Sequence, residues 1–225
     1  MGCECGFLGV APMGRANEAG LYIVVAADIA PAAVESLLEA APVAALLITP
    51  ADGEPLRASQ AKALVELAQA QGVAALIESD APLTRTLRAD GVHLPWSKDI
   101  VARYATAREI LGGRFIVGAD AGRLRDDAMT LGEAGAEYVG FGIPAHVEDR
   151  ETARARQFDL LAWWSEIFEI PCVAFDVETV DDGVRLAQSG ADFIALRAPS
   201  NASATELSRW VREAAHALAA EEDVA

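Results

Sequence analysis

The sequence predicts a single (β/α)8 barrel, the TIM-barrel fold of the α/β class. Short, β-branched apolar runs alternate with longer segments of helical period, which is the pattern of repeated βα units around a parallel sheet. The alternation recurs eight times along 225 residues, a length that fits one undivided domain. Hydrophobic residues make up 52% of the chain and charged residues 23%, so a globular protein is expected.

The eight predicted strands are nearly all apolar, as strands covered on both faces must be. In chain order they comprise residues 21–27, 43–48, 73–77, 91–94, 114–117, 138–141, 172–175 and 193–196. We expect the barrel to span residues 21–220 and residues 1–20 to form a flexible N-terminal segment.

Segments rich in Ala, Leu, Glu and Arg separate the strands, and each is long enough to carry a parallel strand back across the sheet. They include the expected helices 59–71, 100–111 and 204–220. The small-residue turns 134–137 and 189–192, together with 89–91, resemble a faint internal repeat. A doubly wound open sheet shares the alternation, but no Gly-x-Gly-x-x-Gly follows the first strand, which favours the closed barrel.

The composition limits the partners and the location of the protein. A formal net charge of -16 opposes binding to nucleic acid or to anionic lipid. No run approaches the roughly 20 apolar residues of a membrane span. Cys3, Cys5 and Cys172 imply no disulfide framework, and Cys3 and Cys5 lack the second Cys/His cluster of a metal site. We therefore expect a cytoplasmic protein.

Residues just beyond the carboxyl ends of barrel strands build the site in such folds, so candidates can be named before any function is known. They are rich in carboxylates, and a small-molecule ligand such as a heterocycle is the expected partner. The candidates are Glu78, Asp80, His93, Trp96, Asp120, Arg150, Asp176 and Arg197.

Several of these candidates also have purely structural interpretations. Clustered acids can hold Mg²⁺ or raise one another's pKa, but an Asp after a strand can equally cap the next helix. His93 lies within a strand, where a structural role is favoured over a catalytic one. Trp96 can stack on a planar ring or cap the barrel. The pair Trp163 and Trp164 is expected to pack, and a homodimer contact at its edge is left open.

Five segments together resemble the thiamine phosphate synthase/TenI family. They are Asp90-Gly-Val-His-Leu94, Ala107-Arg108-x-x-Leu111-Gly112, Ile116-Val-Gly118, Gly135-Ala-Glu-Tyr-Val-Gly-Phe-Gly142, and Ile170-Pro-x-Val-Ala174 with Gly190-Ala191-Asp192. The corresponding family segments read DGVHLGQ, AR-x-x-LG, IIGVS, GADYVGFGPVF and PVVAIGG. The correspondence covers roughly residues 20 to 200 and is most specific from the fourth to the sixth strand.

The resemblance implies a transferase that binds hydroxymethylpyrimidine diphosphate and a thiazole phosphate. Pyrophosphate would leave to form a stabilised pyrimidine cation, and the two rings would be coupled with Mg²⁺ assistance. Such chemistry needs cations and metal around the diphosphate and backbone N–H groups around the other phosphate. We expect no cofactor, except that Mg²⁺ is expected if synthase activity is retained.

The chain departs from the family at the residues that handle the diphosphate and the metal. The family's Gln-x-Arg-x-Lys after the second strand has no counterpart, because residues 43–54 contain no Gln, Arg or Lys. The family's metal-binding Asp residues correspond to Ser79 and Lys98, and a family cation corresponds to Asp80. We assign no metal ligand.

The loops that would hold the second phosphate have also changed. The family's Ser after the fifth strand corresponds to Asp120, and its Thr-x-Thr-Lys loop corresponds to a segment in which only Arg150 can replace the lysine. The family's Gly-Gly after the seventh strand corresponds to Asp176-Val177 in this chain, and the family's Ser in the eighth strand corresponds to Ala198. Arg197 supplies one cation among several anions.

Three hypotheses follow for a protein of thiamine-related metabolism. The first is a working synthase with an unusual site. The second is a diverged barrel that takes another ligand, such as a cationic or neutral heterocycle on Trp96 held by the acids. The third is a non-catalytic pseudoenzyme or regulatory binding module of the same fold. The missing motifs leave catalytic residues unassigned.

Overall fold

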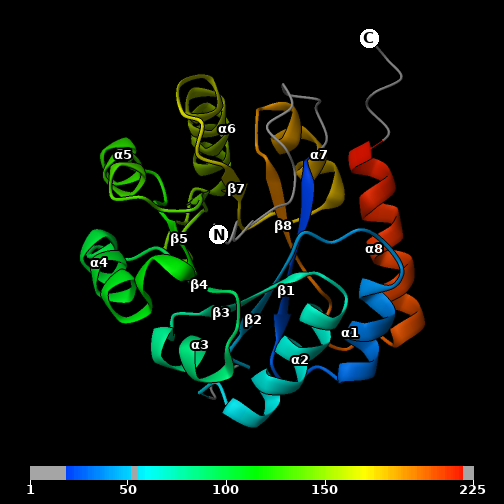
Figure 1. Ribbon diagram of the computed structural model, residues 1–225. Coiled ribbons are helices and arrows are strands. Elements are labelled where there is room, and N and C mark those ends of the chain that lie inside the picture. Colours follow the sequence, from blue (N-terminus) through cyan, green and yellow to red (C-terminus); the bar gives the residue numbers. More distant parts are fainter. Residues whose placement is uncertain (1–18, 52–54, 220–225) are drawn as a thin grey trace, which may run out of the picture.

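The computed structural model describes residues 19–51 and 55–219, which form one closed barrel (Figure 1). Within these ranges eight parallel strands follow one another around the barrel in chain order, from β1 to β8, and β8 pairs with β1. The helices surround the strands on the outside (Figure 1). The predicted (β/α)8 fold class is confirmed.

The strands and helices have the following bounds. The strands are β1 (Gly20–Ala26), β2 (Ala45–Thr49), β3 (Ala74–Glu78), β4 (Gly91–Leu94), β5 (Ile116–Asp120), β6 (Val139–Phe141), β7 (Cys172–Ala174) and β8 (Phe193–Arg197). The helices are α1 (Pro31–Leu38), α2 (Ala58–Ala70), α3 (Ala81–Leu87), α4 (Ile100–Leu111), α5 (Arg125–Glu133), α6 (Arg150–Ile167), α7 (Val180–Gln188) and α8 (Ala204–Ala219), with a short 3-10 helix η1 (Gly112–Arg114).

The largest difference from the prediction concerns β5, which ends at Asp120, three residues beyond the expected end at 117. Residues 114–117 were expected as strand, but Arg114 belongs to η1 and the strand begins at Ile116. The Arg108 guanidinium donates to the carbonyl oxygens of Gly112 and Phe115 and so fastens this turn. The flexible segment expected at 1–20 and its residues Cys3 and Cys5 lie outside the described residues, apart from the last two positions, where β1 begins at Gly20.

Alternate residues of each strand face two different layers of the core. Along β1, Tyr22 and Val24 belong to the cluster inside the barrel, whereas Leu21 and Ile23 belong to the cluster between strands and helices. All four side chains are buried, as the two-sided apolar pattern of parallel strands requires. The inner cluster forms the floor of the barrel below the strand ends.

Two tyrosines and a histidine form a hydrogen-bonded chain inside the barrel. The hydroxyl of Tyr138 lies 3.0 Å from that of Tyr22 and 2.9 Å from Nδ1 of His93. The Tyr138 ring fits because Gly118 has no side chain: a Cβ there would lie 1.9 Å from the ring's Cζ. Because all three side chains are buried, these bonds satisfy polar atoms that water cannot reach.

The faint repeat in the sequence has a structural explanation at the other end of the barrel. The repeat places an acidic residue just before β4, β6 and β8, namely Asp90, Glu137 and Asp192. Each carboxylate accepts a hydrogen bond from a backbone amide of the preceding strand, β3, β5 or β7. The amides are those of Ala75, Val117 and Cys172, at 2.8, 2.7 and 2.8 Å. The repeat therefore ties neighbouring strands together and does not contribute to the site.

The tryptophan pair packs on α6, as expected. Trp164 is fully buried, donates from its indole N–H to the carbonyl of Ile170 and stacks on Phe168 at a centroid distance of 4.0 Å. The Arg125 guanidinium lies 4.5 Å from the centroid of the Trp163 ring. Among the described helices, none is long and apolar enough to cross a membrane.

Candidate active site

A cavity of about 310 Å³ opens at the carboxyl ends of the strands, where barrels of this class carry their sites. Six of the eight sequence candidates line it, and Asp80 and Trp96 do not. The residues lining the cavity are Val24, Leu47, Glu78, His93, Pro95, Asp120, Arg150, Phe175, Asp176, Val177, Glu178, Ala195 and Arg197. With four carboxylates against two guanidinium groups, the lining is net negative.

Asp120 and Asp176, both in the cavity lining, accept hydrogen bonds from backbone amides. Oδ1 of Asp120 accepts from the amides of Gly122 and Gly142, at 2.7 and 3.0 Å. Oδ2 of Asp176 accepts from the amide of Ile143 at 2.8 Å. These contacts contradict the helix-capping interpretation, because α5 begins after Leu124 with no side-chain cap and α7 is capped by Thr179.

The two carboxylates converge over Gly142. A Cβ at Gly142 would lie 2.4 Å from Oδ2 of Asp120 and 2.7 Å from Oδ2 of Asp176. Burial, with the nearby Asp176 carboxylate, raises the pKa of Asp120 from 3.8 to about 6, although the two amide bonds partly oppose the shift. The pair therefore concentrates negative charge at one point of the cavity wall.

His93 is held rigidly as a neutral ring. It stacks on Phe175 at a centroid distance of 4.3 Å and bonds Tyr138 through Nδ1. Burial lowers its pKa to about 3, and the positive charge of Arg103 acts in the same direction. The side chain has both a structural partner and a place in the cavity lining, so the two interpretations of His93 are compatible.

Glu78 and Arg197 also line the cavity, from the ends of β3 and β8. Burial raises the pKa of Glu78, while the positive charges of Arg197 and Arg103 act to lower it. The Arg197 guanidinium also lies 3.5 Å from Oγ1 of Thr49. An acid and a cation of the lining thus interact with each other.

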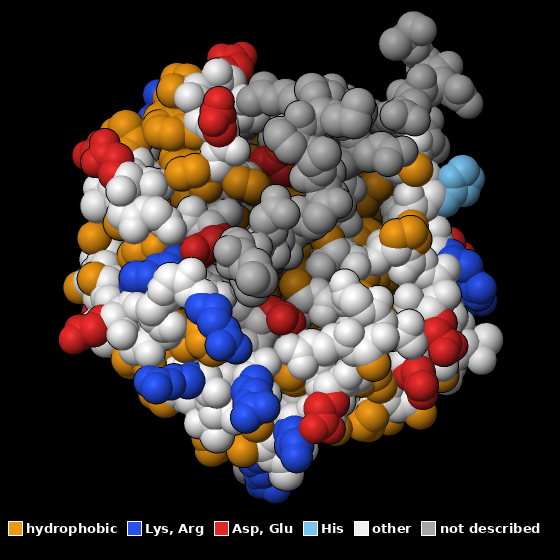
Figure 2. All heavy atoms as spheres, viewed as in Figure 1, with side chains coloured by type: hydrophobic (Ala, Val, Ile, Leu, Met, Phe, Trp, Pro, Cys, Tyr) orange, Lys and Arg blue, Asp and Glu red, His pale blue; other side chains and the backbone are white. Residues whose placement is uncertain are grey.

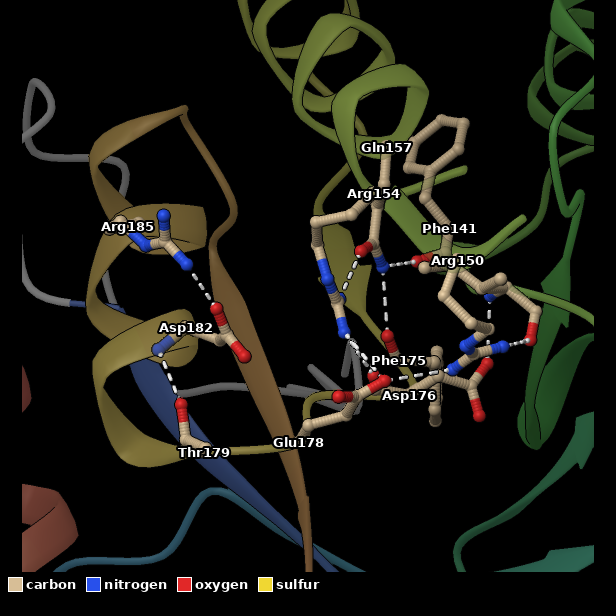
Figure 3. Close-up of polar contacts among 11 residues, drawn as sticks. Phe141, Arg150, Arg154, Gln157, Phe175, Asp176, Glu178, Thr179, Asp182 and Arg185 are labelled. Carbon is tan, nitrogen blue, oxygen red and sulfur yellow. Dashed lines mark hydrogen bonds and ion pairs between the residues drawn. The ribbon is translucent and has the colours of Figure 1, made fainter. Parts of the chain in front are cut away.

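Arg150 is tied to the protein itself, as are two residues of α6 that the sequence did not identify (Figure 3). Arg150 donates to the carbonyl of Ile143 and pairs with Glu178 at 3.3 Å, while Arg154 donates to the carbonyl of Asp176. The buried amide of Gln157 donates to the carbonyls of Phe141 and Phe175, at 2.6 and 2.8 Å. Gln157 therefore fixes the ends of β6 and β7 relative to α6.

Asp80 and Trp96 have other places in the fold. Oδ1 of Asp80 accepts from the amide of Leu83 at 2.8 Å and so caps α3. Trp96 lines a separate cavity beside the barrel mouth, where its ring lies 5.1 Å from that of His146. The structure thus does not bring either residue together with the other six candidates.

The residues present do not fit the Mg²⁺ that the family resemblance implies. Ser79 offers a neutral hydroxyl that accepts from the Arg103 guanidinium at 3.2 Å, and Lys98 offers a cation. Hard divalent cations require several oxygen ligands, preferably carboxylates. Over the described ranges 19–51 and 55–219, no three His, Cys, Asp or Glu side chains are grouped to hold a metal ion.

Comparison with known proteins identifies the relatives of the chain. Residues 21–199 match the family described as thiamine monophosphate synthase, TMP-TENI. A thiamine-phosphate synthase of Hyphomonas neptunium is 41% identical over 60% of this chain and 59% of its own length. That of Erythrobacter litoralis is 38% identical over 60% and 63%. The alignments thus span about three-fifths of these relatives, whereas a thiamine-phosphate synthase of an Azoarcus species is 33% identical over 84% of this chain and 93% of its own length.

Solved structures share the barrel fold of this chain. The thiamine phosphate pyrophosphorylase of Pyrococcus furiosus superposes with a TM-score of 0.72 at 22% identity, covering 91% of this chain and 97% of that one. A tryptophan synthase chain of Mycobacterium tuberculosis superposes with a TM-score of 0.65 at 15% identity, covering 90% and 93%. At these identities the similarity concerns the fold alone. The sequence match over residues 21–199 shows that the chain belongs to the thiamine phosphate synthase/TenI family.

Proposed function

We propose that this family member has diverged from coupling hydroxymethylpyrimidine diphosphate to thiazole phosphate. Its cavity would instead hold a small heterocycle that is neutral or cationic and carries no phosphate group. Thiamine-related metabolism in the cytoplasm remains the expected setting.

The observation that carries the proposal is that backbone amides next to the cavity donate to two carboxylates of its lining. Free backbone N–H groups at strand and helix ends are what bind a phosphate. Here the amides of Gly142 and Ile143 already donate to Asp120 and Asp176. A phosphate would have to displace two anions from these amides and would then lie beside them, which Coulomb repulsion opposes.

The remaining cations do not compensate for this arrangement. Arg150 pairs with Glu178, and the positive charge of Arg197 already acts on the carboxylate of Glu78. The diphosphate motif after β2 and the two metal-binding acids are also missing from the sequence. A ligand with a ring N–H or a protonated nitrogen could, in contrast, donate charge-assisted hydrogen bonds to Oδ2 of Asp120 or to Glu78.

A coupling assay tests the first half of the proposal. The purified chain is incubated with both phosphorylated precursors and Mg²⁺, and thiamine phosphate is measured, with the Azoarcus relative as the positive control. We expect no product at high protein concentration. Product formation at a rate comparable with that of the control would overturn the proposal.

A thermal-shift panel tests the second half. It compares hydroxymethylpyrimidine and the thiazole alcohol with their phosphate esters. A ligand at 100 times its dissociation constant stabilises the fold by about 2.7 kcal/mol, so binding is readily seen. We expect the free heterocycles to stabilise the protein more than their esters. A flat panel would support the alternative of a non-catalytic member or regulatory binding module.

A further inference from the structure

A second cavity lies outside the barrel mouth and shares no lining residue with the first. Its volume is also about 310 Å³, near the lower end of the range for ligand pockets. It lies between the loops that follow β4, β5 and β6, next to α5 and α6, which are neighbours in the outer ring (Figure 1). Its lining consists of Trp96, Arg123, Leu124, Pro144, His146 and Arg156.

Two aromatic rings form one side of this outer cavity. The rings of Trp96 and His146 lie 5.1 Å apart and are inclined by 33°. Trp96 is held against Gly122, where a Cβ would lie only 2.4 Å from Cδ1 of the indole. The indole is thus fixed by backbone packing while part of its surface lines the cavity. A fixed indole face is suited to stacking against a planar ring.

Two arginines provide the charge of the outer cavity. Within residues 19–51 and 55–219, the side chains of Arg123 and Arg156 make no hydrogen bond or ion pair. Arg150 and Arg154, which lie on α6 together with Arg156, both pair with Glu178. Since Asp and Glu outnumber Lys and Arg by 34 to 18 in this chain, two arginines without an acidic partner at one cavity are unexpected.

We propose that the outer cavity binds a planar aromatic anion, a ring that carries a phosphate or a carboxylate. The ring stacks on Trp96 beside His146, and the anionic group accepts hydrogen bonds from Arg123 and Arg156. Guanidinium groups match both anions through paired N–H donors, and the fixed indole selects for the ring. This site is independent of the inner cavity, whose carboxylates disfavour anions.

Calorimetric titration with simple probes tests the proposal. The probes are phenyl phosphate, benzoate, phenol and inorganic phosphate. We expect an aromatic anion to bind at least about tenfold more tightly than phenol or inorganic phosphate, because each of these lacks half of the recognition. Tighter binding of phenyl phosphate than of benzoate identifies a phosphate ligand, and the reverse order identifies a carboxylate ligand. The absence of binding by both aromatic anions would overturn the proposal.

Matched variants locate the binding. Arg123→Gln and Arg156→Gln should each lower the affinity for the aromatic anion by about tenfold. This is the size expected for the loss of one charge-assisted hydrogen bond. Arg125→Gln is the control, since Arg125 lies two positions away but contacts Trp163 and not the outer cavity. It should leave the affinity unchanged. If Arg197→Gln lowers the affinity for the probe while Arg123→Gln and Arg156→Gln do not, the probe binds in the inner cavity and the proposal is wrong.

Discussion

At the scale of single residues, Asp120 is the most informative side chain of the inner cavity. Its two amide bonds stabilise the charged form, yet burial and the Asp176 carboxylate leave the pKa at about 6. A folded-state pKa above the unfolded value means that the charged form costs stability. The cost is absent below the unfolded pKa of 3.8 and is fully present once the pH has risen through about 6.

The first prediction concerns Asp120→Asn. The asparagine keeps an oxygen for the amides of Gly122 and Gly142, removes the buried charge and can donate to Asp176. A shift of about two pKa units corresponds to about 3 kcal/mol, so the free energy of unfolding at pH 7 should rise by up to that amount. Urea denaturation at pH 7 and pH 5 measures the gain, which should be smaller at pH 5.

The exposed Asp99 provides a control, because its side chain makes no capping hydrogen bond at α4. Asp99→Asn should change the free energy of unfolding by less than about 0.5 kcal/mol at either pH. An Asp120→Asn protein that is less stable than the original at pH 7 would contradict the description of the carboxylate pair.

At the scale of elements, the barrel interior depends on a glycine. Gly118→Ala places a methyl group 1.9 Å from Cζ of Tyr138, so the ring must move and its bonds to Tyr22 and His93 must break. We expect a loss of about 3 kcal/mol or more, measured by chemical denaturation, as overpacking and unsatisfied buried polar groups combine. Gly113→Ala is the control, since nothing lies within 4 Å of its new Cβ. Equal stabilities of the two variants would refute this description.

The N-terminus of α3 is capped by Asp80, one of the candidate site residues predicted from the sequence. Asp80→Ala should lower the free energy of unfolding by about 1 kcal/mol, the usual cost of a lost N-cap, and Asp80→Asn should largely restore it. Thermal-shift ligand titration should show unchanged heterocycle binding in both variants. A large loss of affinity in Asp80→Asn would mean that this residue reaches the ligand.

The sequence predicted elements better than contacts. The bounds of α4 and β4 agree with the prediction because their apolar period and flanking residues are unambiguous. The start of β5 was missed because Arg108 holds the preceding turn, a contact from another element. Asp120 and Asp176 were located correctly at strand ends, but the sequence could not show that the amides of Gly142 and Ile143, just after β6, bind them. Arg154 and Gln157 were missed because polar residues in a helix look solvent-exposed until the helix is packed against the barrel.

At the scale of the whole molecule, charge is distributed unevenly between two cavities. The chain carries a net charge of -16, and Figure 2 shows Lys and Arg side chains gathered on one part of the face in view while acidic side chains are spread around it. The inner cavity is lined by four carboxylates and two guanidinium groups, whereas the outer cavity is lined by two arginines and no acid. A ligand's charge should therefore decide which cavity it enters.

The most direct test of the central claim restores the amide cradle of the inner cavity. Asp120→Ser and Asp176→Gly introduce the residues that the family resemblance assigns to these positions, and glycine is suited to the backbone of Asp176, whose φ is +56°. Both substitutions are made in an Arg123→Gln/Arg156→Gln background, which removes the outer cavity's cations. Calorimetric titration with inorganic phosphate should show binding to this protein and none to the background protein. Equal phosphate affinity of the two would contradict the claim that Asp120 and Asp176 occupy the anion site.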